Sequence, residues 1–466
     1  MKTPVPWRWF TFPFALAIAL AACSDSRSES TKTISAREAR LSPAQAAARA
    51  AWSQALSDTS PAPAAPPSAD SSTKYPAFTP NAPRIDRHGG VSLVAPKIVT
   101  VTWGDDPNRD VFEAFDDQLG ASSFWNVMSE WGTGPATPGG HVHVPGAFPS
   151  YTDTLLGDDS TFQQFIRQNA LDPSSGWPQY SDQTIYVMWI PQGADFSVQG
   201  MVGCQDVLGY HSQTSPTPAG GGSAPTIVYA SVFYCGGAPG DSTTYLASHE
   251  IAEAASDPYS IGPFQTGINT IDEAHGAYNV YFGPSVEIAD ACGWWIQEEP
   301  PPFAFNVQRL FSNAAFAAGH GPCVPALGPE TYYNATTFPS QMDDVKLDLT
   351  VTGWGKASTA KGFKVPIGQS RTFDVGFYSD GPTGDWTLQA VVLPTLPILD
   401  ADFNPIANGG LDVKIDKPKG SNGHVAHVTV TPTSAGSGIG ASYFELRSGY
   451  VDFPVIRTLP ILVGQE

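Results

Sequence analysis

Positive charge and cysteine are both scarce in this sequence. Of its 466 residues, 24 are lysine or arginine and 44 are aspartate or glutamate, which gives a net charge of -20. A surface with this balance repels nucleic acid phosphates and anionic lipid headgroups, so nucleic acid is excluded as a partner. Charged residues make up only 15% of the chain, whereas glycine (45), proline (43) and aromatic residues (11%) are well represented. This mixture is typical of exported proteins that are rich in loops and strands.

The apolar run at the N-terminus, residues 9–22, is too short to span a bilayer comfortably and has the layout of a secretion signal. Its end, Leu20-Ala-Ala-Cys23, resembles a bacterial lipobox, in which the cysteine becomes the lipidated first residue; the alternative is an ordinary signal peptide with an incidental cysteine. Ser24 in the next position agrees with sorting to the outer membrane. We therefore expect residues 1–23 to be a lipoprotein signal peptide. Cys23 would anchor an exported protein in the bacterial cell envelope, and the lipid alone would touch the membrane.

Three further segments follow the signal peptide. Residues 24–84 are rich in serine, alanine and proline and contain too little apolar bulk to offset chain entropy, so they are expected to form a disordered tether. Residues 85–328 combine apolar runs with helical spacing, and residues 329–466 carry short alternating segments. This order predicts an α+β chain with two folded domains.

The first of these domains is expected to contain a sheet and several helices. Buried strands are predicted at 97–103, 185–190 and 226–232, where β-branched and aromatic residues run together. Helical spacing extends over 111–131, and a further helix is expected at 161–169. The helix that follows the third strand should then lie against the sheet.

That helix, between Ser248 and Pro258, carries the clearest chemical pattern in the chain. Its alanine-rich sequence favours helix, and Pro258 ends it because the residue before a proline avoids helical backbone. His249 and Glu253 are four residues apart, so they project from one face with a spacing suited to holding a cation. The pattern resembles the His-Glu-x-x-His helix of zincins, with a glutamate in place of the second histidine.

The zincin resemblance implies a role for each polar residue of this helix. His249 and Glu253 would be metal ligands, and Glu250 would be the general base that acts on a metal-bound water. Zinc is the expected metal, while a carboxylate in place of the second imidazole also admits manganese or calcium. The alternative is an amphipathic helix with a solvated acidic edge.

Other polar residues are candidates for completing such a centre. Glu287 is the candidate third ligand, by analogy with the glutamate that follows the helix in gluzincins. Asp290 could orient His249 through its other ring nitrogen, and Asp257 competes for both roles. His211 could be an additional ligand or could polarise substrate; a loop histidine hydrogen-bonded to backbone fits its sequence equally well.

Two more groups of side chains carry weaker signals. His141 and His143 share a face if their segment is extended and could then hold a metal, although such a pair is more often part of a surface loop. His275, Tyr278 and Tyr281 lie between the acidic motifs and are candidates for donating a hydrogen bond to a developing oxyanion.

Four cysteines remain beyond Cys23. An even number in an exported chain implies disulfides, and no C-x-x-C spacing favours zinc ligation instead. Of the three connectivities we predict the sequential one, in which each bond closes a loop of about thirty residues. The predicted pairs are Cys204 with Cys235 and Cys292 with Cys323.

Several of these motifs occur in a characteristic order over about residues 85–325. The order comprises His88-Gly-Gly90, Cys204, His211, Cys235, the 249–258 motif and Glu287-x-x-Asp290-x-Cys292. It resembles the plant EXORDIUM or phosphate-induced protein 1 family, whose motif positions coincide with Glu250, Glu253, Asp257, Glu287 and Asp290. Members of that family are secreted and associated with cell walls and growth. The resemblance therefore strengthens the candidate site and implies no particular substrate.

Residues 329–466 have the pattern of an all-β domain. Turn signals such as Asn408-Gly-Gly410 separate alternating segments, which favours an immunoglobulin-like or fibronectin-like sandwich. The segment contains no catalytic constellation, so a spacer or a module that holds polymer or protein is expected. The predicted strands are 346–352, 372–377, 386–392, 411–415, 424–430, 443–447 and 455–463.

Two functions are consistent with these patterns. The first is a surface-anchored metal-dependent hydrolase that acts on peptide or cell-wall polymer. A peptidase is the hydrolase that we expect first. The second is a non-catalytic surface protein in which a structural cation or an ion-pair cluster holds the acidic site together. The first requires that His249, Glu253 and an acidic residue of 287–290 meet in the folded chain.

Overall fold

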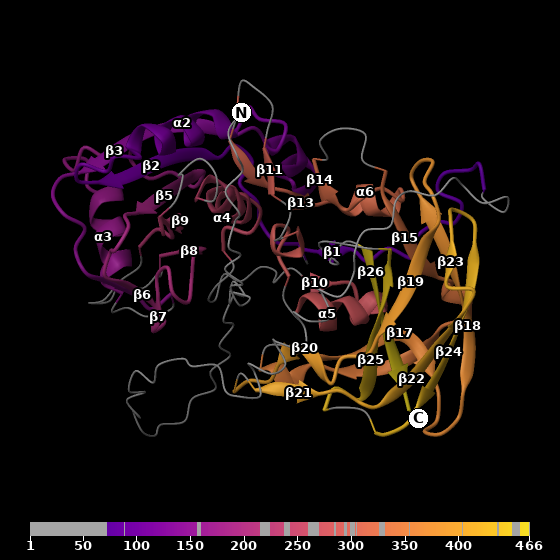
Figure 1. Cartoon of the computed structure of the whole chain (residues 1–466). Coiled ribbons are helices and arrows are strands. Elements are labelled where there is room, and N and C mark those ends of the chain that lie inside the picture. The colour runs from indigo at the N-terminus through magenta and orange to yellow at the C-terminus, as the bar shows by residue number, and fades with distance from the viewer. Residues whose placement is uncertain are drawn as a thin grey trace, which may run out of the picture.

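A computed structural model of the chain describes residues 72–465 apart from 88, 156–159, 215–223, 237–242, 260–269, 284–285, 293–295, 299–302, 304, 326–330, 354, 403, 436–437 and 450–456. The expected signal peptide with Cys23, the tether up to residue 71 and His88 lie outside the described residues. The described chain contains both helices and strands, as the α+β prediction requires (Figure 1). None of its helices is long and apolar enough to cross a membrane.

The first domain is built on a five-stranded sheet. Its strand order is β3-β2-β5-β9-β8, in which the first four strands run parallel and β8 lies antiparallel at the edge. β5 and β9 are buried along their whole length, as is usual for strands covered on both faces, and this explains their continuously apolar sequences. The strands are β3 (Thr137–Val144), β2 (Lys97–Trp103), β5 (Thr184–Ile190), β9 (Val228–Phe233) and β8 (Gly209–Gln213).

Helices cover both faces of this sheet (Figure 1). On one face lie α2 (Arg109–Leu119), the 3₁₀ helix η1 (Trp125–Trp131) and α4 (Thr244–Ser256); α3 (Thr161–Ala170) covers the other. The helical spacing of 111–131 thus resolves into two helices. They are separated at Gly120, where a side chain would lie 2.2 Å from the carbonyl oxygen of Ala136.

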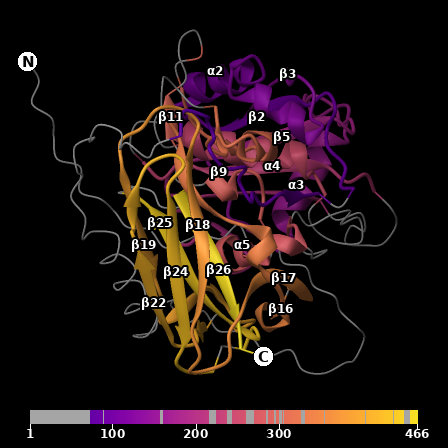
Figure 2. The same cartoon turned by 90° about the vertical axis from the view of Figure 1, so that its right-hand side faces the viewer.

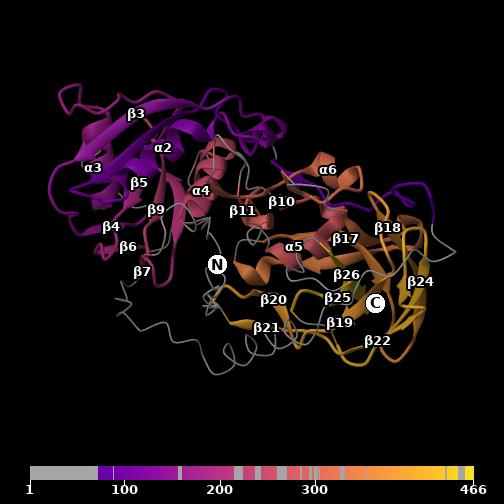
Figure 3. The same ribbon diagram turned by 45° about the horizontal axis from the view of Figure 1, so that its top comes forward.

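Helix α4 runs past the sheet edge and is almost entirely buried. It begins four residues before the predicted start and ends where Pro258 predicts, with Asp257 as its C-terminal cap. One side packs on β8 and β9, and the other packs on β12 (Asn306–Gln308). Figure 3 shows α4 on the side of the first domain that faces α5 (Gly276–Phe282). Because α4 has little contact with solvent, its polar side chains need partners inside the protein.

Short elements complete the first domain. The two-stranded pairings are β1 with β10, β11 with β12, and β13 with β14, and β4, β6 and β7 form a small sheet. Their bounds are β1 (Ile85–Asp86), β4 (Tyr151–Asp153), β6 (Phe196–Val198), β7 (Met201–Val202), β10 (Thr270–Ile271), η3 (Glu273–His275), η4 (Asp290–Cys292), β11 (Ile296–Glu298), β13 (Leu310–Phe311), α6 (Asn313–Ala317) and β14 (Cys323–Val324).

Both predicted disulfides are present. Cys204 is bonded to Cys235, which joins the loop before β8 to the end of β9. Cys292 is bonded to Cys323, which joins η4 to β14. Each bond therefore fixes a segment that neighbours a candidate site residue, His211 in one case and Asp290 in the other.

The second domain consists of two sheets packed face to face (Figure 2). Six of the seven predicted strands are present, whereas only residues 346–348 of the predicted strand 346–352 lie in a strand, because Thr350–Thr352 form a 3₁₀ helix. The additional strands are β15, β17, β23 and the β20-β21 hairpin. One sheet has the order β15 (Tyr333–Thr337), β18 (Arg371–Ser379), β24 (Val425–Pro432), β22 (Leu411–Asp416). The other has the order β16 (Asp343–Asp348), β17 (Ala357–Lys364), β26 (Thr458–Gly464), β25 (Ala441–Ser448), β19 (Trp386–Val391), β23 (Lys419–Gly420). The remaining elements are η5 (Pro339–Gln341), η6 (Thr350–Thr352), β20 (Thr395–Leu399) and β21 (Pro405–Ala407).

The two domains share buried contacts through α5. Its residues Ala277 and Val280 belong to a core that also contains Leu347 and Tyr443 of the sandwich. The first domain is therefore packed on the second rather than linked to it by a free hinge.

Residues 72–84 belong by composition to the expected tether, but residues 72–81 lie on the sandwich and Arg84 is hydrogen-bonded to Asp272 of the first domain. The side-chain amide of Asn422 donates to the backbone carbonyls of Ser72 and Lys74 and accepts from the backbone of Ala77. Further along, the backbone N–H of Asn81 donates to Thr336. These hydrogen bonds offset the low apolar content that makes the segment resemble a disordered one.

Asp116 on α2 provides a test of this core that is independent of any ligand. The carboxyl is buried and accepts a hydrogen bond of 2.9 Å from Trp189 Nε1, and burial raises its pKa from 3.8 to about 7. An acid with a raised pKa in the folded state loses stability as the pH rises from its unfolded value through its folded value. In the native protein the free energy of unfolding should therefore fall as the pH rises from 4 to 7, and Asp116→Asn should abolish this fall. The pH-dependent contribution that distinguishes the two proteins should reach about 3 to 5 kcal/mol at pH 8.

Urea unfolding at pH 5 and pH 8 measures this difference. Asp117→Asn, which changes a neighbouring and partly exposed carboxylate, is the control and should keep the native slope. Equal pH slopes in Asp116→Asn and the native protein would show that the buried carboxyl does not titrate in this range.

Candidate metal centre

The candidate site begins with two faces of α4. His249 projects toward β12, whereas Glu250, Glu253 and Asp257 follow one another along the strip that faces the β8 side of the sheet. Glu253 belongs to both surroundings, because its carboxylate lies between the two histidines of the site. Its side chain is completely buried.

His211 enters the site from β8. It stands opposite Ala230 of β9 in the antiparallel pair, and its side chain is 4% exposed. Its Nδ1 lies 3.6 Å from Glu253 Oε2 and 3.6 Å from Glu250 Oε2. Its Nε2 lies 3.3 Å from Glu287 Oε1. The structure therefore places His211 among three carboxylates rather than in a surface loop.

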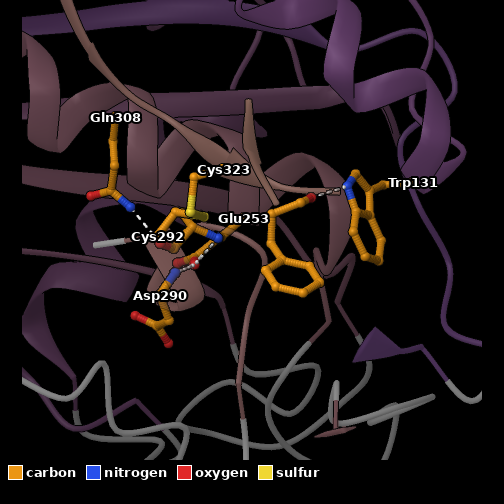
Figure 4. The surroundings of a disulfide bond; sticks show 8 residues. Trp131, Glu253, Asp290, Cys292, Gln308 and Cys323 are labelled. Atoms are coloured by element: carbon orange, nitrogen blue, oxygen red, sulfur yellow. Dashed lines mark hydrogen bonds between the residues drawn. A yellow bond between two sulfur atoms is a disulfide. The ribbon is translucent and has the colours of Figure 1, made fainter. Parts of the chain in front are cut away.

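The segment from Glu287 to Cys292 closes the site from the other side. The backbone N–H groups of Ala289 and Asp290 both donate to Glu253 Oε1 at 3.2 Å, so this segment is fixed directly to α4. Figure 4 shows Glu253 and Asp290 beside the Cys292–Cys323 disulfide, which holds the same turn from behind. These contacts leave Glu253 Oε2 as the oxygen that faces the histidines.

His249 is the second imidazole of the site. Its Nε2 lies 2.9 Å from Glu253 Oε2 and 3.6 Å from Asp290 Oδ1. Despite this short contact, Glu253 Oε2 is among the buried polar atoms without a hydrogen-bond partner. Sequence analysis favours Glu287 beside His249 and Glu253; in the structure Asp290 takes that place, and Glu287 lies with His211.

Gln308 determines which nitrogen of His249 faces the acids. Its side-chain amide, labelled in Figure 4, donates to the carbonyl of Ala289. Its Oε1 therefore points the other way and lies 3.0 Å from His249 Nδ1. The oxygen can only accept, and Nδ1 therefore carries a hydrogen. The lone pair of a neutral His249 is then on Nε2, the atom that faces Glu253 and Asp290. This is how a side chain outside the ligand set orients a metal-binding histidine.

Gly209 makes room for Glu250. A Cβ at this position would lie 2.8 Å from Glu250 Oε1 and 3.0 Å from its Cγ. Since real Cβ contacts are not that short, any side chain at 209 would displace the Glu250 carboxylate. The absence of a side chain on β8 thus lets Glu250 lie against the sheet edge, next to His211.

The atoms that converge here have no hydrogen-bond partners. Among the described residues, the buried polar atoms without one include both ring nitrogens of His211, Oε2 of Glu250 and of Glu253, and Oε1 of Glu287. Buried polar atoms are nearly always paired, and a group of five without partners indicates a missing ligand. Two sets of ligand atoms lie within 4.8 Å of one another: His211, Glu253, Glu287 and His249, Glu253, Asp290.

A buried carboxylate elsewhere in the domain behaves differently. Asp153 is fully buried, yet its two oxygens accept five hydrogen bonds, among them 2.7 Å from the Tyr210 hydroxyl and 3.0 Å from Gln163 Nε2. The fold is therefore able to satisfy a buried acid with its own donors. At the acidic centre it does not do so, which distinguishes a binding site from a structural one.

The electrostatics of the ion-free centre favour bound protons. Burial, followed by repulsion from Glu287, raises the pKa of Asp257 to about 7, and burial followed by repulsion from Glu253 raises the pKa of Asp290. Burial alone would lower the pKa of His211, but the carboxylates of Glu287 and Glu250 outweigh it and raise the pKa well above 6.5. A cation that binds here would displace these protons, so its affinity should increase with pH.

The weaker candidates of the sequence lie elsewhere. His141 and His143 are on the extended strand β3. His141 contacts Glu113 and Asp117 of α2 and does not belong to either candidate set of metal ligands. His275 has both ring nitrogens occupied, one by Asp272 at 2.7 Å and one by Asn81 at 3.0 Å. Tyr278 is buried in the core of the first domain, and Tyr281 packs toward the sandwich.

Sequence analysis did not identify Gln308 or Gly209. An amide and a glycine carry no motif of their own, and their roles depend on contacts across 59 and 41 residues of sequence. A comparison of the chain with models of protein families, with curated proteins and with solved structures finds no match, so the geometry of the site itself carries its interpretation.

Proposed function

We propose that this protein is a metal-dependent hydrolase of the bacterial cell surface. The observation that supports the proposal most directly is the convergence of buried, unpartnered nitrogen and oxygen atoms around Glu253. A divalent cation bound there would polarise a carbonyl and make a water more acidic. A peptide bond is the carbonyl substrate most consistent with the zincin-like helix, so a peptidase is the leading assignment.

His249 Nε2, Glu253 Oε2 and Asp290 Oδ1 would hold the cation. Of the two sets of ligand atoms, this one is the more accessible, since 12% of the His249 side chain and 21% of the Asp290 side chain are exposed. A substrate needs such access. One imidazole and two carboxylates suit zinc or manganese, whereas calcium usually takes six or more oxygen ligands.

Glu250 would take a proton from the attacking water. It is adjacent in sequence to His249, its Oε2 has no hydrogen-bond partner, and Gly209 leaves it room beside the sheet edge. Gln308 would keep His249 in the tautomer that presents Nε2 to the cation. His211 would serve as an additional metal ligand or would polarise the substrate, on the side of the centre that lies next to β8 and Glu287.

The finer description of the two domains belongs to the same proposal. A helix that carries the ligands beside a mostly parallel sheet with an antiparallel edge strand supports a zincin-like first domain. Two facing sheets support an immunoglobulin-like second domain, for which we propose a role as a spacer or as a module that holds polymer or protein. Two disulfides support export, since such bonds persist in oxidising compartments.

A non-catalytic protein held together by a structural cation is the second candidate. The observation that favours it is the burial of the inner set, where the side chains of His211, Glu253 and Glu287 are 4%, 0% and 6% exposed. In that case chelation would lower the melting temperature, and no peptide, ester or amide in a substrate screen would be hydrolysed.

Glu250→Gln separates the two functions. The amide has the same shape and cannot accept the proton, so we expect hydrolysis to fall by about 10²- to 10³-fold while metal content and melting temperature stay unchanged. Elemental analysis and a peptide-library assay on the full-length protein measure both effects. A purified protein without stoichiometric metal, or hydrolysis that Glu250→Gln leaves intact, would contradict the proposal.

Gly209→Ala tests the position of the Glu250 carboxylate without changing Glu250 itself. The added methyl would lie 2.8 Å from Glu250 Oε1 and must move the carboxylate, so we expect hydrolysis to fall by about 10²-fold with metal retained. Gly438→Ala is the control, because the nearest atom to its methyl would be 3.9 Å away. If both alanine variants are equally active, Glu250 does not need its position beside β8.

A further inference from the structure

The two sets of ligand atoms meet in a single residue. Glu253 belongs to both, and its Oε2 lies 2.9 Å from His249 Nε2 and 3.6 Å from His211 Nδ1. Its other oxygen is occupied by two backbone N–H groups and cannot serve a second ion. We infer that the centre binds two divalent cations, an outer one and an inner one, that share Glu253. The inference extends the proposed cation binding and does not depend on catalysis.

The inner position has its own ligands. Glu287 Oε1 and both ring nitrogens of His211 are buried and without partners, and they lie away from His249. The outer cation, held at His249 and Asp290, would leave these atoms as they are. A second cation would bind Glu287 Oε1 and one ring nitrogen of His211, and the other ring nitrogen would then carry a hydrogen.

The distances agree with ligands around an ion. Two atoms that each bind a tetrahedral metal at 2.0 to 2.1 Å are separated by about 3.3 Å. His211 Nε2 lies 3.3 Å from Glu287 Oε1, longer than the roughly 2.7 to 2.9 Å of charge-assisted hydrogen bonds. His211 Nδ1, which lies 3.6 Å from Glu253 Oε2, is on the opposite side of the ring, so only one of the two ring nitrogens binds the inner cation.

The charge of the centre points the same way. Glu250, Glu253, Asp257, Glu287 and Asp290 carry a charge of -5 when ionised. One divalent cation leaves -3 in a buried region, and two leave -1, which Arg87 near Asp257 can compensate. Buried charge is costly unless it is neutralised, so the second cation removes most of the remaining repulsion.

A shared carboxylate makes the two ions neighbours. Ions in two-metal sites are typically about 3.5 to 4 Å apart, close enough for their unpaired electrons to interact when both are manganese. The pair would thus have a spectroscopic signature that two separate sites lack. It would also couple the sites, since each ion fixes the Glu253 oxygen for the other.

Reconstitution of the metal-free full-length protein with Mn²⁺ alone tests the inference. We expect two ions per chain by elemental analysis, together with a spin-coupled manganese signal by electron paramagnetic resonance. His211→Ala and Glu287→Gln should each reduce the content from two ions to one and replace the coupled signal with that of isolated manganese. His249→Ala should do the same from the outer side. His427→Ala is the control, because it removes a histidine paired with Asp374 at 2.7 Å on the sandwich and should leave two ions.

The outcomes separate this inference from the proposed hydrolase. Saturation at one ion in the native protein, or two ions in both His211→Ala and Glu287→Gln, would overturn the two-cation centre. Glu287→Gln keeps the inference testable if His211→Ala does not fold. A protein that binds one ion and is hydrolytically active would contradict the inner cation and support the hydrolase. A protein that binds two ions and hydrolyses no substrate would support the two-cation centre and contradict the hydrolase.

Discussion

Glu253→Ala is expected to remove bound metal completely and to reduce hydrolysis by about 10⁴-fold, because Glu253 Oε2 belongs to both sets of ligand atoms. Loss of the cation eliminates several kcal/mol of transition-state stabilisation, each 1.36 kcal/mol of which is worth about a factor of ten. The loss should exceed that of Glu250→Gln, which leaves the cation in place. Elemental analysis after dialysis and the peptide-library assay provide the measurements.

The alanine substitution also removes a structural contact, which a second variant isolates. Glu253 Oε1 accepts from the backbone of Ala289 and Asp290, so Glu253→Ala leaves two buried N–H groups without an acceptor. Glu253→Gln can keep that acceptor and lacks the negative charge that faces the histidines. We expect it to fold with a near-native melting temperature and still to lose metal. Native metal content in Glu253→Gln would show that this carboxylate is not a ligand.

Asp153→Ala is expected to produce the largest loss of stability, about 4 kcal/mol, and to do so equally with and without metal. Removing this buried carboxylate takes an acceptor away from five donors, and each unsatisfied donor is costly; Ser160 Oγ and Gln163 Nε2 keep a second acceptor in the backbone carbonyls of Thr152 and Leu155. The donors are the hydroxyls of Tyr210, Tyr229 and Ser160, the backbone N–H of Leu155 and Nε2 of Gln163.

Urea unfolding in the presence and absence of a chelator measures this effect. Asp172→Ala, which changes an exposed aspartate that bonds Ser174, should shift the free energy of unfolding by no more than about 0.5 kcal/mol. A loss in Asp153→Ala that depends on metal would mean that Asp153 communicates with the acidic centre. The structure predicts that it does not.

Much of the fold could be predicted because its strongest signals are local. The strands β2, β5 and β9 are short runs rich in β-branched and aromatic residues, and the end of α4 is determined by Pro258, one residue beyond its cap. The predicted sequential pairing of the cysteines, one of three possible connectivities, is also confirmed. The strands and the end of α4 depend on residues that are close in sequence, and a sequence pattern can therefore predict them.

The strand that carries His211 could not be found in that way. The sequence of β8, Gly-Tyr-His-Ser-Gln, neither alternates nor runs apolar, although four of its five residues are buried. Its conformation comes from antiparallel pairing with β9, in which His211 stands opposite Ala230. Only that pairing shows that the histidine points at α4.

The prediction of Glu287 as the third ligand beside His249 and Glu253 differs from the structure, which places Asp290 there, for a similar reason. Glu287 and Asp290 are three residues apart, and which of them lies beside His249 depends on the turn that hydrogen-bonds to Glu253 Oε1. A sequence gives the spacing of two acids but not the direction of the backbone between them. The same limit hid Gln308, whose amide acts only through its contacts with His249 and Ala289.

The contact between residue 72 and the sandwich determines how a membrane anchor would hold the molecule. The backbone N–H of Ser72 donates to the carbonyl of Asn422, so the chain toward the N-terminus leaves the described structure at the second domain. A lipid on Cys23 would then attach the protein to the membrane through the second domain, even though the first domain comes earlier in the sequence. A force applied at Ser72 toward the N-terminus would act on the sandwich before it acts on the first domain.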